Sequence, residues 1–238
     1  NISNLFMAGR DISATHIAHG SIRLIRTCGG GGQAVGTAAY LCKQYDGDPR
    51  SVGKEHIDEL QQTLLKYDCH IPGIRNEDPE DLARGARVSA SSEHEDPESG
   101  YVFAAERVIS GLSRGRDGDE NLWISVPVTA DPSPWIRLDW EKPVELNTVH
   151  LTFDTMVREQ RFFDRPVLGP ISTCVSDFAI EYTDENGRWR VARRVAGNYL
   201  RHRVLKLKTI RTNSIRIKVE KTNGDPHARI YEVRIYAE

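Results

Sequence analysis

The sequence predicts a mainly β protein, an antiparallel β-sandwich preceded by a short helical segment. Residues 135–140 and 148–153 alternate apolar and polar side chains, which is typical of two strands with one buried face. From residue 86 onward, further short alternating segments recur between long loops. Before residue 68, apolar residues recur at helical spacing instead. Because two strands are not stable alone in water, the other strands should cover their apolar face.

Composition limits the classes of function. The chain has 238 residues, of which 39% are hydrophobic and 28% charged, as in ordinary globular proteins. A net charge of −2 argues against nucleic acid as the main partner, because phosphate binding usually brings a basic excess. No apolar run is long enough to cross a bilayer. The four cysteines are dispersed without C-x-x-C spacing, which favours buried thiols over a disulfide framework or zinc site and leaves the compartment open.

The first half predicts a short strand and two helices. Leu5–Ala8 read as a buried strand that ends in a turn at Gly9. The run Gly29–Gly32 leads into a helix of small residues, whose free N–H groups would suit an anion; the alternative is a loop or a close-packing device. An amphipathic helix is expected at Lys54–Tyr67, with Ser51 as a possible N-cap.

A boundary is expected between these helices and the strands. Residues 71–85 combine Pro72, Gly73 and Pro79 with a cluster of acids, a composition typical of a linker. We therefore divide the chain into a helical segment at 1–70, a linker at 71–85 and a sandwich at 86–238. The expected strands cover residues 87–91, 135–140, 148–153, 178–182, 189–191, 205–207, 215–219 and 231–235. Asn186-Gly187 is expected to form a hairpin turn, since both residues tolerate positive φ.

Three long loops of the second half combine aromatic and hydrogen-bonding side chains, as sugar recognition requires. The candidate ligand-binding residues are His94 and Tyr101 in the first loop, Arg158 and Phe162 in the second, and Asn223, Asp225 and His227 in the third. The second loop has an alternative interpretation, in which Phe162 and Phe163 fold inward and are buried.

The second half resembles the discoidin family, the coagulation-factor type C domain. The resemblance rests on ARGARVSASSE, AAERVISGL, ENLWIS, WIRLDWEKPVELNTVHLTFD and EVRIYAE, in that order, over about residues 84–238. It implies a galactose-binding-like jelly roll whose loops cluster at one end and bind glycans or cell-surface groups. Some members hold a structural calcium after a D-G element. Here that element reads Ser110-Gly111, so calcium would need Asp117 or Asp119 instead, and no metal ligand is assigned from the residues themselves.

The first half resembles the C-terminal flavin-binding segment of FAD-dependent oxidoreductases, over about residues 3–68. The resemblance rests on AGRDIS at residues 8–13 and GQAVGTAA at residues 32–39. It implies that a helix beginning near Gly32 points its N-terminus at FAD, that Asp11 accepts from a ribityl hydroxyl, and that Arg10 and Arg23 hold phosphate or orient the substrate. The cofactor-binding residues it implies are Gly9, Arg10, Asp11, Ser13, Arg23, Gly32, Gln33, Ala34 and Gly36. The run Gly29–Gly31 departs from the family, where larger residues are usual.

The sequence lacks the G-x-G-x-x-G fingerprint and following acid that bind the nucleotide half of FAD. We therefore expect the C-terminal piece of a larger oxidoreductase, a fragment that is not itself catalytic and does not hold FAD tightly. Its expected partners are the nucleotide-binding domain of the same protein and a carbohydrate. The sandwich then binds carbohydrate or buttresses the flavin domain. The alternative is a stand-alone glycan- or surface-binding module with no redox role.

Overall fold

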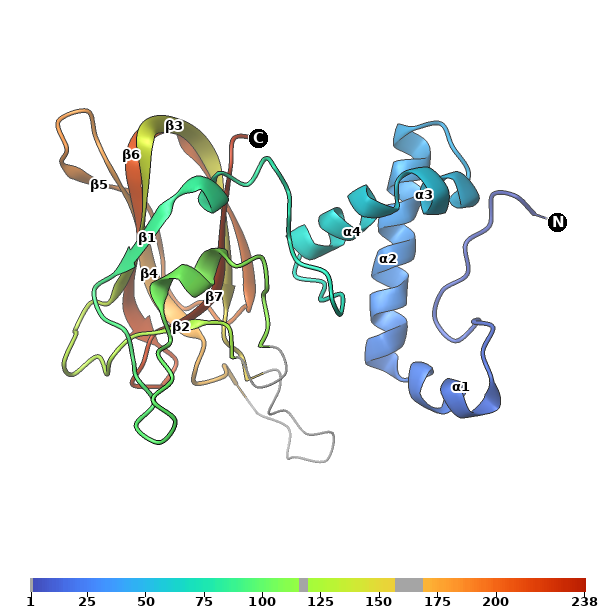
Figure 1. Ribbon diagram of the computed structural model, residues 1–238, viewed down its shortest axis with the longest axis horizontal. Coiled ribbons are helices and arrows are strands. Elements are labelled where there is room, and N and C mark those ends of the chain that lie inside the picture. The colour runs from blue at the N-terminus through green and yellow to red at the C-terminus, as the bar shows by residue number, and fades with distance from the viewer. Residues whose placement is uncertain (1, 116–119, 157–168) are drawn as a thin grey trace. The chain divides into compact units, whose positions relative to one another are not determined.

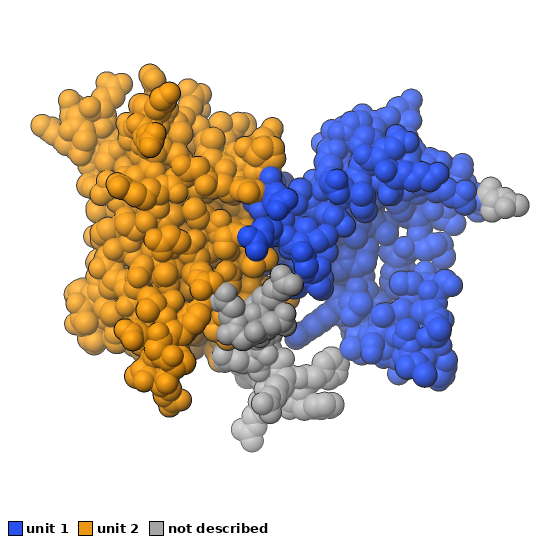
Figure 2. All heavy atoms as spheres, in the orientation of Figure 1, with its two compact units in different colours: residues 1–77 blue, residues 78–238 orange. Residues whose placement is uncertain are grey.

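The computed structural model describes residues 2–115, 120–156 and 169–238. The chain divides into two compact units, Asn1–Glu77 and Asp78–Glu238 (Figure 2). Each unit has its own apolar core, so each is described by itself. Among the described residues, no helix is both long enough and apolar enough to span a membrane.

Residues 2–77 form four helices. These are α1 (His16–Ile22), α2 (Ile25–Gln44), α3 (Pro49–Glu55) and α4 (Ile57–Lys66). Ala38 and Leu41 of α2 pack against Val52 of α3, with Phe6 and Leu60 partly buried beside them. This core is small for a segment of this length, and it leaves most of α1 and the first half of α2 in contact with solvent.

Two boundaries predicted in this unit are wrong. Residues 2–15 contain neither helix nor strand, so Leu5–Ala8 is not a strand; it has no sheet in this unit to pair with. Helix α2 begins at Ile25 and runs through Gly29–Gly32, which therefore do not precede it. Glycine lowers helix stability without preventing helical φ and ψ, so the flanking residues can carry the helix through the run.

The predicted helix at Lys54–Tyr67 is two helices, since the chain leaves helical geometry at His56 (φ −129°, ψ 22°). Ser51 is not the N-cap. Asp48 caps α3, and its carboxylate accepts hydrogen bonds from the backbone N–H groups of Arg50 (3.0 Å) and Ser51 (2.8 Å). The Ser51 hydroxyl accepts in return from the Asp48 N–H at 3.0 Å, which completes a capping box.

The described residues of unit 2 form seven strands, all paired antiparallel (Figure 1). They are β1 (Arg87–Ala90), β2 (Trp123–Ile124), β3 (Trp135–Phe153), β4 (Val175–Thr183), β5 (Trp189–Val195), β6 (His202–Thr222) and β7 (Arg229–Tyr236), with 3₁₀ turns η1 (Leu82–Gly85) and η2 (Ala105–Ile109). The order is β2-β7-β3-β6-β4-β5, with β1 on the other side of β3. The mainly β antiparallel sandwich predicted from the sequence is confirmed.

Strands β3 and β6 are each one long strand where the sequence predicts two. The first half of β3 pairs with β1 and the second half of β6, while its second half pairs with β7 and the first half of β6. The register shifts between Asp139 and Val144, where Pro143 offers no N–H to the ladder. Both strands thus pass from one layer of the sandwich to the other, and the buried side chains of Trp123, Phe153 and Phe178 fill the space between.

The sandwich therefore has two different ends. At the loop end lie residues 91–103, 125–134, 196–201 and 222–229, which connect separate strands (Figure 1). At the bend end lie residues 140–144, 183–188 and 209–214, where β3 and β6 bend and the β4–β5 hairpin turns. The hairpin forms at the predicted Asn186-Gly187, with Gly187 at φ 72° and its N–H donating to the carbonyl oxygen of Asp184 at 2.8 Å.

Candidate functional site

Backbone hydrogen bonds bring two of the three predicted ligand loops together at the loop end. The His94 N–H donates to the Ile124 carbonyl oxygen at 2.8 Å, and the Ser125 N–H donates to the Ala228 carbonyl oxygen at 3.0 Å. Strand β2 thus lies between the loop that carries His94 and the loop that carries His227. Arg158 and Phe162, the candidates of the second predicted loop, lie outside the described residues.

Rings from these two loops form one cluster, which we call the histidine cluster: His94, Tyr101, Phe103 and His227. The centroids of His94 and His227 are 4.7 Å apart, and those of His94 and Phe103 are 5.9 Å apart. Tyr101 meets Phe103 edge-on at 4.8 Å, and the Arg107 guanidinium carbon lies 5.5 Å from the Tyr101 centroid. The cluster is half-buried, so it combines apolar ring surface with groups that can reach solvent.

The polar atoms of the cluster have defined roles. His227 Nδ1 lies 2.8 Å from the Ser125 carbonyl oxygen, which can only accept, so Nδ1 carries the proton. Within the part of the chain that the structure describes, no hydrogen bond of His227 Nε2 is present, so this atom can accept from a ligand hydroxyl. Burial lowers the pKa of His94, and His227 and Arg229 lower it further, although Asp96 opposes them. His94 is therefore biased toward its neutral form.

Two other predicted ligand residues, Asn223 and Asp225, form hydrogen bonds with other residues of the protein. The Asn223 amide donates to the carbonyl oxygens of Cys174 (3.0 Å) and Asn198 (2.9 Å) and so holds neighbouring loops together. The Asp225 carboxylate accepts from the His227 N–H at 2.8 Å and from Arg229 Nη2 at 3.1 Å. Both side chains shape the loop that carries His227, and a direct contact to a ligand stays a prediction for each.

Arg107 and Asp154 are residues of this end that the sequence does not single out. Asp154 lies 3.6 Å from Arg229 Nη1, which places a second carboxylate on that guanidinium. The signal that could have identified Asp154 is its position, directly after the last residue of a predicted strand, where loop residues commonly form binding sites.

Ser110-Gly111, the element that corresponds to the calcium loop of the discoidin family, makes hydrogen bonds within the protein. The Ser110 hydroxyl accepts from the Asn121 amide at 2.9 Å, and the Gly111 N–H donates to Glu232 Oε1 at 3.0 Å. Burial raises the pKa of Glu232 to about 8, against the opposing effect of Arg234. In the described ranges, no group of three His, Cys, Asp or Glu side chains could hold a metal ion. Asp117 and Asp119 lie outside those ranges, so calcium stays a prediction.

The residues expected at FAD lie in two places in unit 1. Gly9 (φ 76°), Arg10, Asp11 and Ser13 belong to the irregular segment before α1, and the Arg10 carbonyl oxygen accepts from the Ile12 N–H at 2.9 Å. Gly32, Gln33, Ala34 and Gly36 lie inside α2, and Arg23 lies between α1 and α2. The side chains of Arg10, Asp11 and Arg23 are exposed.

The α2 amides do not fit a flavin as the helix stands. An interior residue of an α-helix donates its N–H to the carbonyl four residues earlier, so the amides of Gly32, Gln33 and Ala34 are already bonded. Helix α2 begins seven residues before Gly32, at Ile25, and only its first turn leaves N–H groups without a helical partner. We therefore derive no step through a flavin from this unit alone.

Unit 1 also exposes apolar side chains that folded proteins usually cover. Ile17 and Ile25 are 88% and 90% exposed. Leu5, Met7 and Ile12 are each more than half exposed.

Comparisons with known proteins agree with both halves. The family model described as FAD dependent oxidoreductase matches residues 1–64, about a quarter of the chain. No curated protein matches. Among solved structures, the family 32 carbohydrate-binding module of Streptococcus pneumoniae EndoD is 19% identical, covers 66% of this chain and 99% of its own, and has a TM-score of 0.50.

Two further structures are similar over the same part. The module CBM32-3 from a family 31 glycoside hydrolase of Clostridium perfringens is 21% identical, covers 67% of this chain and 96% of its own, and has a TM-score of 0.49. A fucose binding module of Streptococcus pneumoniae is 17% identical. It covers 66% of this chain and 95% of its own, and it also has a TM-score of 0.49.

The second unit shares the fold of the first of these structures, a galactose-binding-like β-sandwich. Residues 1–64 of the first unit match the FAD dependent oxidoreductase model. The chain thus joins a segment that is similar to FAD dependent oxidoreductases to a β-sandwich of the galactose-binding-like fold, in the order that the two resemblances in the sequence predict.

Proposed function

We propose that this chain is the C-terminal portion of an FAD-dependent oxidoreductase, with the sandwich as an accessory domain that binds carbohydrate. The observation that carries the proposal is the family match at residues 1–64, in a unit whose core is too small to cover its own apolar side chains. On this proposal the chain is not catalytic by itself. Its partner is a nucleotide-binding domain of the same protein, which supplies the flavin site and covers residues such as Ile17 and Ile25.

The glycine run in α2 supports a rearrangement when that domain is present. Each glycine in a helix interior lowers stability by about 1 kcal/mol relative to alanine, so Gly29–Gly32 together cost about 4 kcal/mol. A Cβ built on any of these four glycines would meet no atom of the described residues within 4 Å, so close packing inside the unit does not require glycine. We infer that the first turns of α2 unwind and that the helix then begins at Gly32, which frees the amides of Gln33 and Ala34 for FAD.

The loop end supports the carbohydrate part of the proposal. The histidine cluster presents ring edges and faces of Tyr101 and Phe103 beside His94 and His227, which can exchange hydrogen bonds with sugar hydroxyls. The EndoD module, which shares this fold, is a carbohydrate-binding module by name. The role of His94, Tyr101 and His227 as ligand contacts is part of this proposal. The alternative is that the sandwich only buttresses the flavin domain and binds no ligand.

A second candidate is a glycan-binding module with no redox role. It is favoured by the amides of Gly32, Gln33 and Ala34, which are already hydrogen-bonded within α2 and so are not free to bind FAD. The two are separated by the visible absorption spectrum of the full gene product beside this 238-residue chain. A yellow full product and a colourless chain support the flavoprotein. If both are colourless and neither takes up added FAD, the flavoprotein proposal is overturned and the second candidate replaces it.

A further inference from the structure

One stretch of the sandwich is strongly cationic in a chain whose net charge is −2. Of the 24 residues from 188 to 211, nine are Arg or Lys and none is Asp or Glu. The stretch contains β5, an edge strand, and the first half of β6. Arg193 Nη1 donates to the Lys206 carbonyl oxygen at 3.3 Å, so these parts of β5 and β6 approach each other, although β4 lies between the two strands in the sheet order. The charge is therefore concentrated on one side of the sandwich.

The exposed cations of this side divide into two sets. Arg190, Arg194 and Lys206 each contact a carboxylate, of Asp184 (2.9 Å), Glu220 and Glu238 (2.6 Å) respectively. The second set is Arg188, Arg193, Lys208 and Arg211, which are exposed and make no ion pair with any acid among the residues described here. We call these four residues the cationic face. Their charge is available to an anionic partner.

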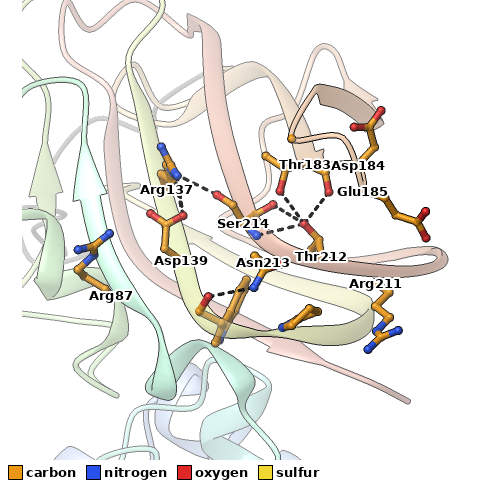
Figure 3. Close-up of a pocket in the computed structure, with 13 residues that line it drawn as sticks. Arg87, Arg137, Asp139, Thr183, Asp184, Glu185, Arg211, Thr212, Asn213 and Ser214 are labelled. Atoms are coloured by element: carbon orange, nitrogen blue, oxygen red, sulfur yellow. Dashed lines mark hydrogen bonds and ion pairs between the residues drawn. The ribbon is translucent and has the colours of Figure 1, made fainter.

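The cationic face continues into a pocket at the bend end. The pocket has a volume of about 760 Å³, within the usual range for ligand sites, and Arg87 and Arg211 lie on opposite sides of it (Figure 3). Between them, Arg137 Nε and Nη2 donate to Asp139 Oδ1 at 2.9 and 2.8 Å, and Nε also donates to the Ser214 hydroxyl at 3.0 Å. Asp139 and Asn213 add acceptors to the same pocket. Such a mixture of donors and acceptors suits a group rich in hydroxyls.

These observations favour a polysaccharide over a nucleic acid. The carboxylates of Asp139, Asp184 and Glu185 line the pocket and accept hydrogen bonds from hydroxyl groups, which a polysaccharide offers on every sugar and duplex DNA does not. Single-stranded nucleic acid is usually held on free aromatic rings. Two indole rings lie at or near the site, and neither is free: Trp140, which lines the pocket, is 9% exposed, and the Arg216 guanidinium carbon lies 4.2 Å from the Trp189 centroid. Within the stretch, Val191 and Val204 are exposed aliphatic side chains, and the exposed ring of Tyr199 lies in the 196–201 loop, at the other end of the sandwich from the pocket.

We propose that the cationic face and the bend-end pocket bind an acidic polysaccharide, one whose sugars carry carboxylate or sulfate groups. The face would hold the charges of successive sugars, and the pocket would take one sugar between Arg87 and Arg211. This site lies at the opposite end of the sandwich from the histidine cluster. It extends the carbohydrate part of the proposed function, but it does not depend on the flavin or on the loop-end site.

The test is affinity electrophoresis of the whole chain in gels that contain polygalacturonate, heparin, uncharged dextran or duplex DNA. The variant Arg193→Ala/Lys208→Ala/Arg211→Ala removes three charges of the face. The matched control Arg26→Ala/Arg50→Ala/Lys54→Ala removes three exposed charges of unit 1. Circular dichroism checks that both variants are folded, and a salt series on the unchanged protein tests the same electrostatic contact without any substitution.

The expected result is retardation by polygalacturonate or heparin that falls as salt is raised. It should weaken about tenfold in the face variant and stay unchanged in the control, since each exposed charge contact contributes a factor of about two. Comparing the two polymers tells carboxylate from sulfate. Absence of retardation, or equal weakening in both variants, overturns the proposal, and so does tighter binding of DNA through the face. A His227→Ala variant that loses neutral glycan but keeps polygalacturonate separates this site from the loop-end site.

Discussion

The imidazole rings of His94 and His227 lie 4.7 Å apart, centroid to centroid, with their planes inclined by 57°. One ring comes from the loop after β1 and the other from the loop before β7. The Ser125 carbonyl fixes the proton of His227 on Nδ1, and burial keeps the pKa of His94 low. His94 is therefore biased toward neutral imidazole, and neutral imidazole accepts a hydrogen bond from a sugar hydroxyl.

We predict that His227→Ala weakens binding of a neutral glycan about tenfold. The substitution removes one ring from the cluster and one acceptor, and a lost hydrogen bond together with lost ring contact is worth about 1–2 kcal/mol. Isothermal titration with the best ligand of a glycan array would measure the change. Tyr199→Ala is the matched control, because Tyr199 is 64% exposed at the same end and lies outside the cluster. Equal losses in the two variants would argue against the histidine cluster as the site.

The lowered pKa of His94 predicts a loss of stability in acid. As pH falls below about 6.5, the unfolded chain takes up the proton before the folded chain does, so the free energy of unfolding decreases. In His94→Gln this contribution is absent, and Tm should decline less steeply from pH 7 to pH 5. His16→Gln, on the exposed side of α1, serves as the control. A parallel decline in parent and His94→Gln would show that this ring does not couple folding to pH.

Local patterns predicted the strands because alternation depends only on neighbouring residues. The two halves of β3 and the Asn186-Gly187 hairpin lie where the sequence places them. Long-range features were not predictable in the same way. The continuity of β3 through Pro143 depends on its pairing with β6 on both sides of the bend. The contact between His94 and His227 depends on backbone pairing through β2 and the chain next to it.

The start of α2 was not predictable from the sequence for a different reason. Gly29–Gly32 read as a loop because isolated glycines destabilise a helix, and the structure continues the helix through them. Helical geometry there is supported by flanking residues alone, without side-chain packing at the glycines. Because the balance is close, a partner domain could change it, and a single sequence does not contain that partner's contribution.

We predict that Gly30→Ala/Gly31→Ala stabilises α2 by about 1–2 kcal/mol in this chain. Both positions are exposed, and an added Cβ would meet no described atom within 4 Å, so only the helix propensity changes. Far-ultraviolet circular dichroism should show higher helix content and a higher Tm for unit 1. If the parent protein binds FAD as proposed, the same change should weaken FAD uptake by the full gene product, because it opposes unwinding before Gly32. Unchanged FAD uptake would leave the inferred new helix start without support.

Asp81 gives a prediction about the sandwich itself. Its Oδ1 accepts from the Ile235 N–H of β7 at 3.0 Å and from the Ala83 N–H of η1 at 3.1 Å. Burial raises the pKa of this carboxyl to about 6, in spite of these hydrogen bonds and Arg234. Asp81→Ala leaves two buried N–H groups without this acceptor, so it should lower the free energy of unfolding by about 1–3 kcal/mol.

The raised pKa of Asp81 also fixes the sign of a pH effect. Between the ordinary value of 3.8 and about 6, the folded state holds the proton that the unfolded chain has lost. Stability from this group is therefore complete below pH 3.8 and is lost as pH rises through 6. Asp81→Asn keeps the acceptor and removes the charge, so its stability relative to the parent should rise between pH 4 and pH 7. Urea unfolding at both pH values measures the difference, with Glu185→Gln at an exposed position as the control. A relative stability of Asp81→Asn that is the same at both pH values would show that Asp81 is already ionised at pH 4.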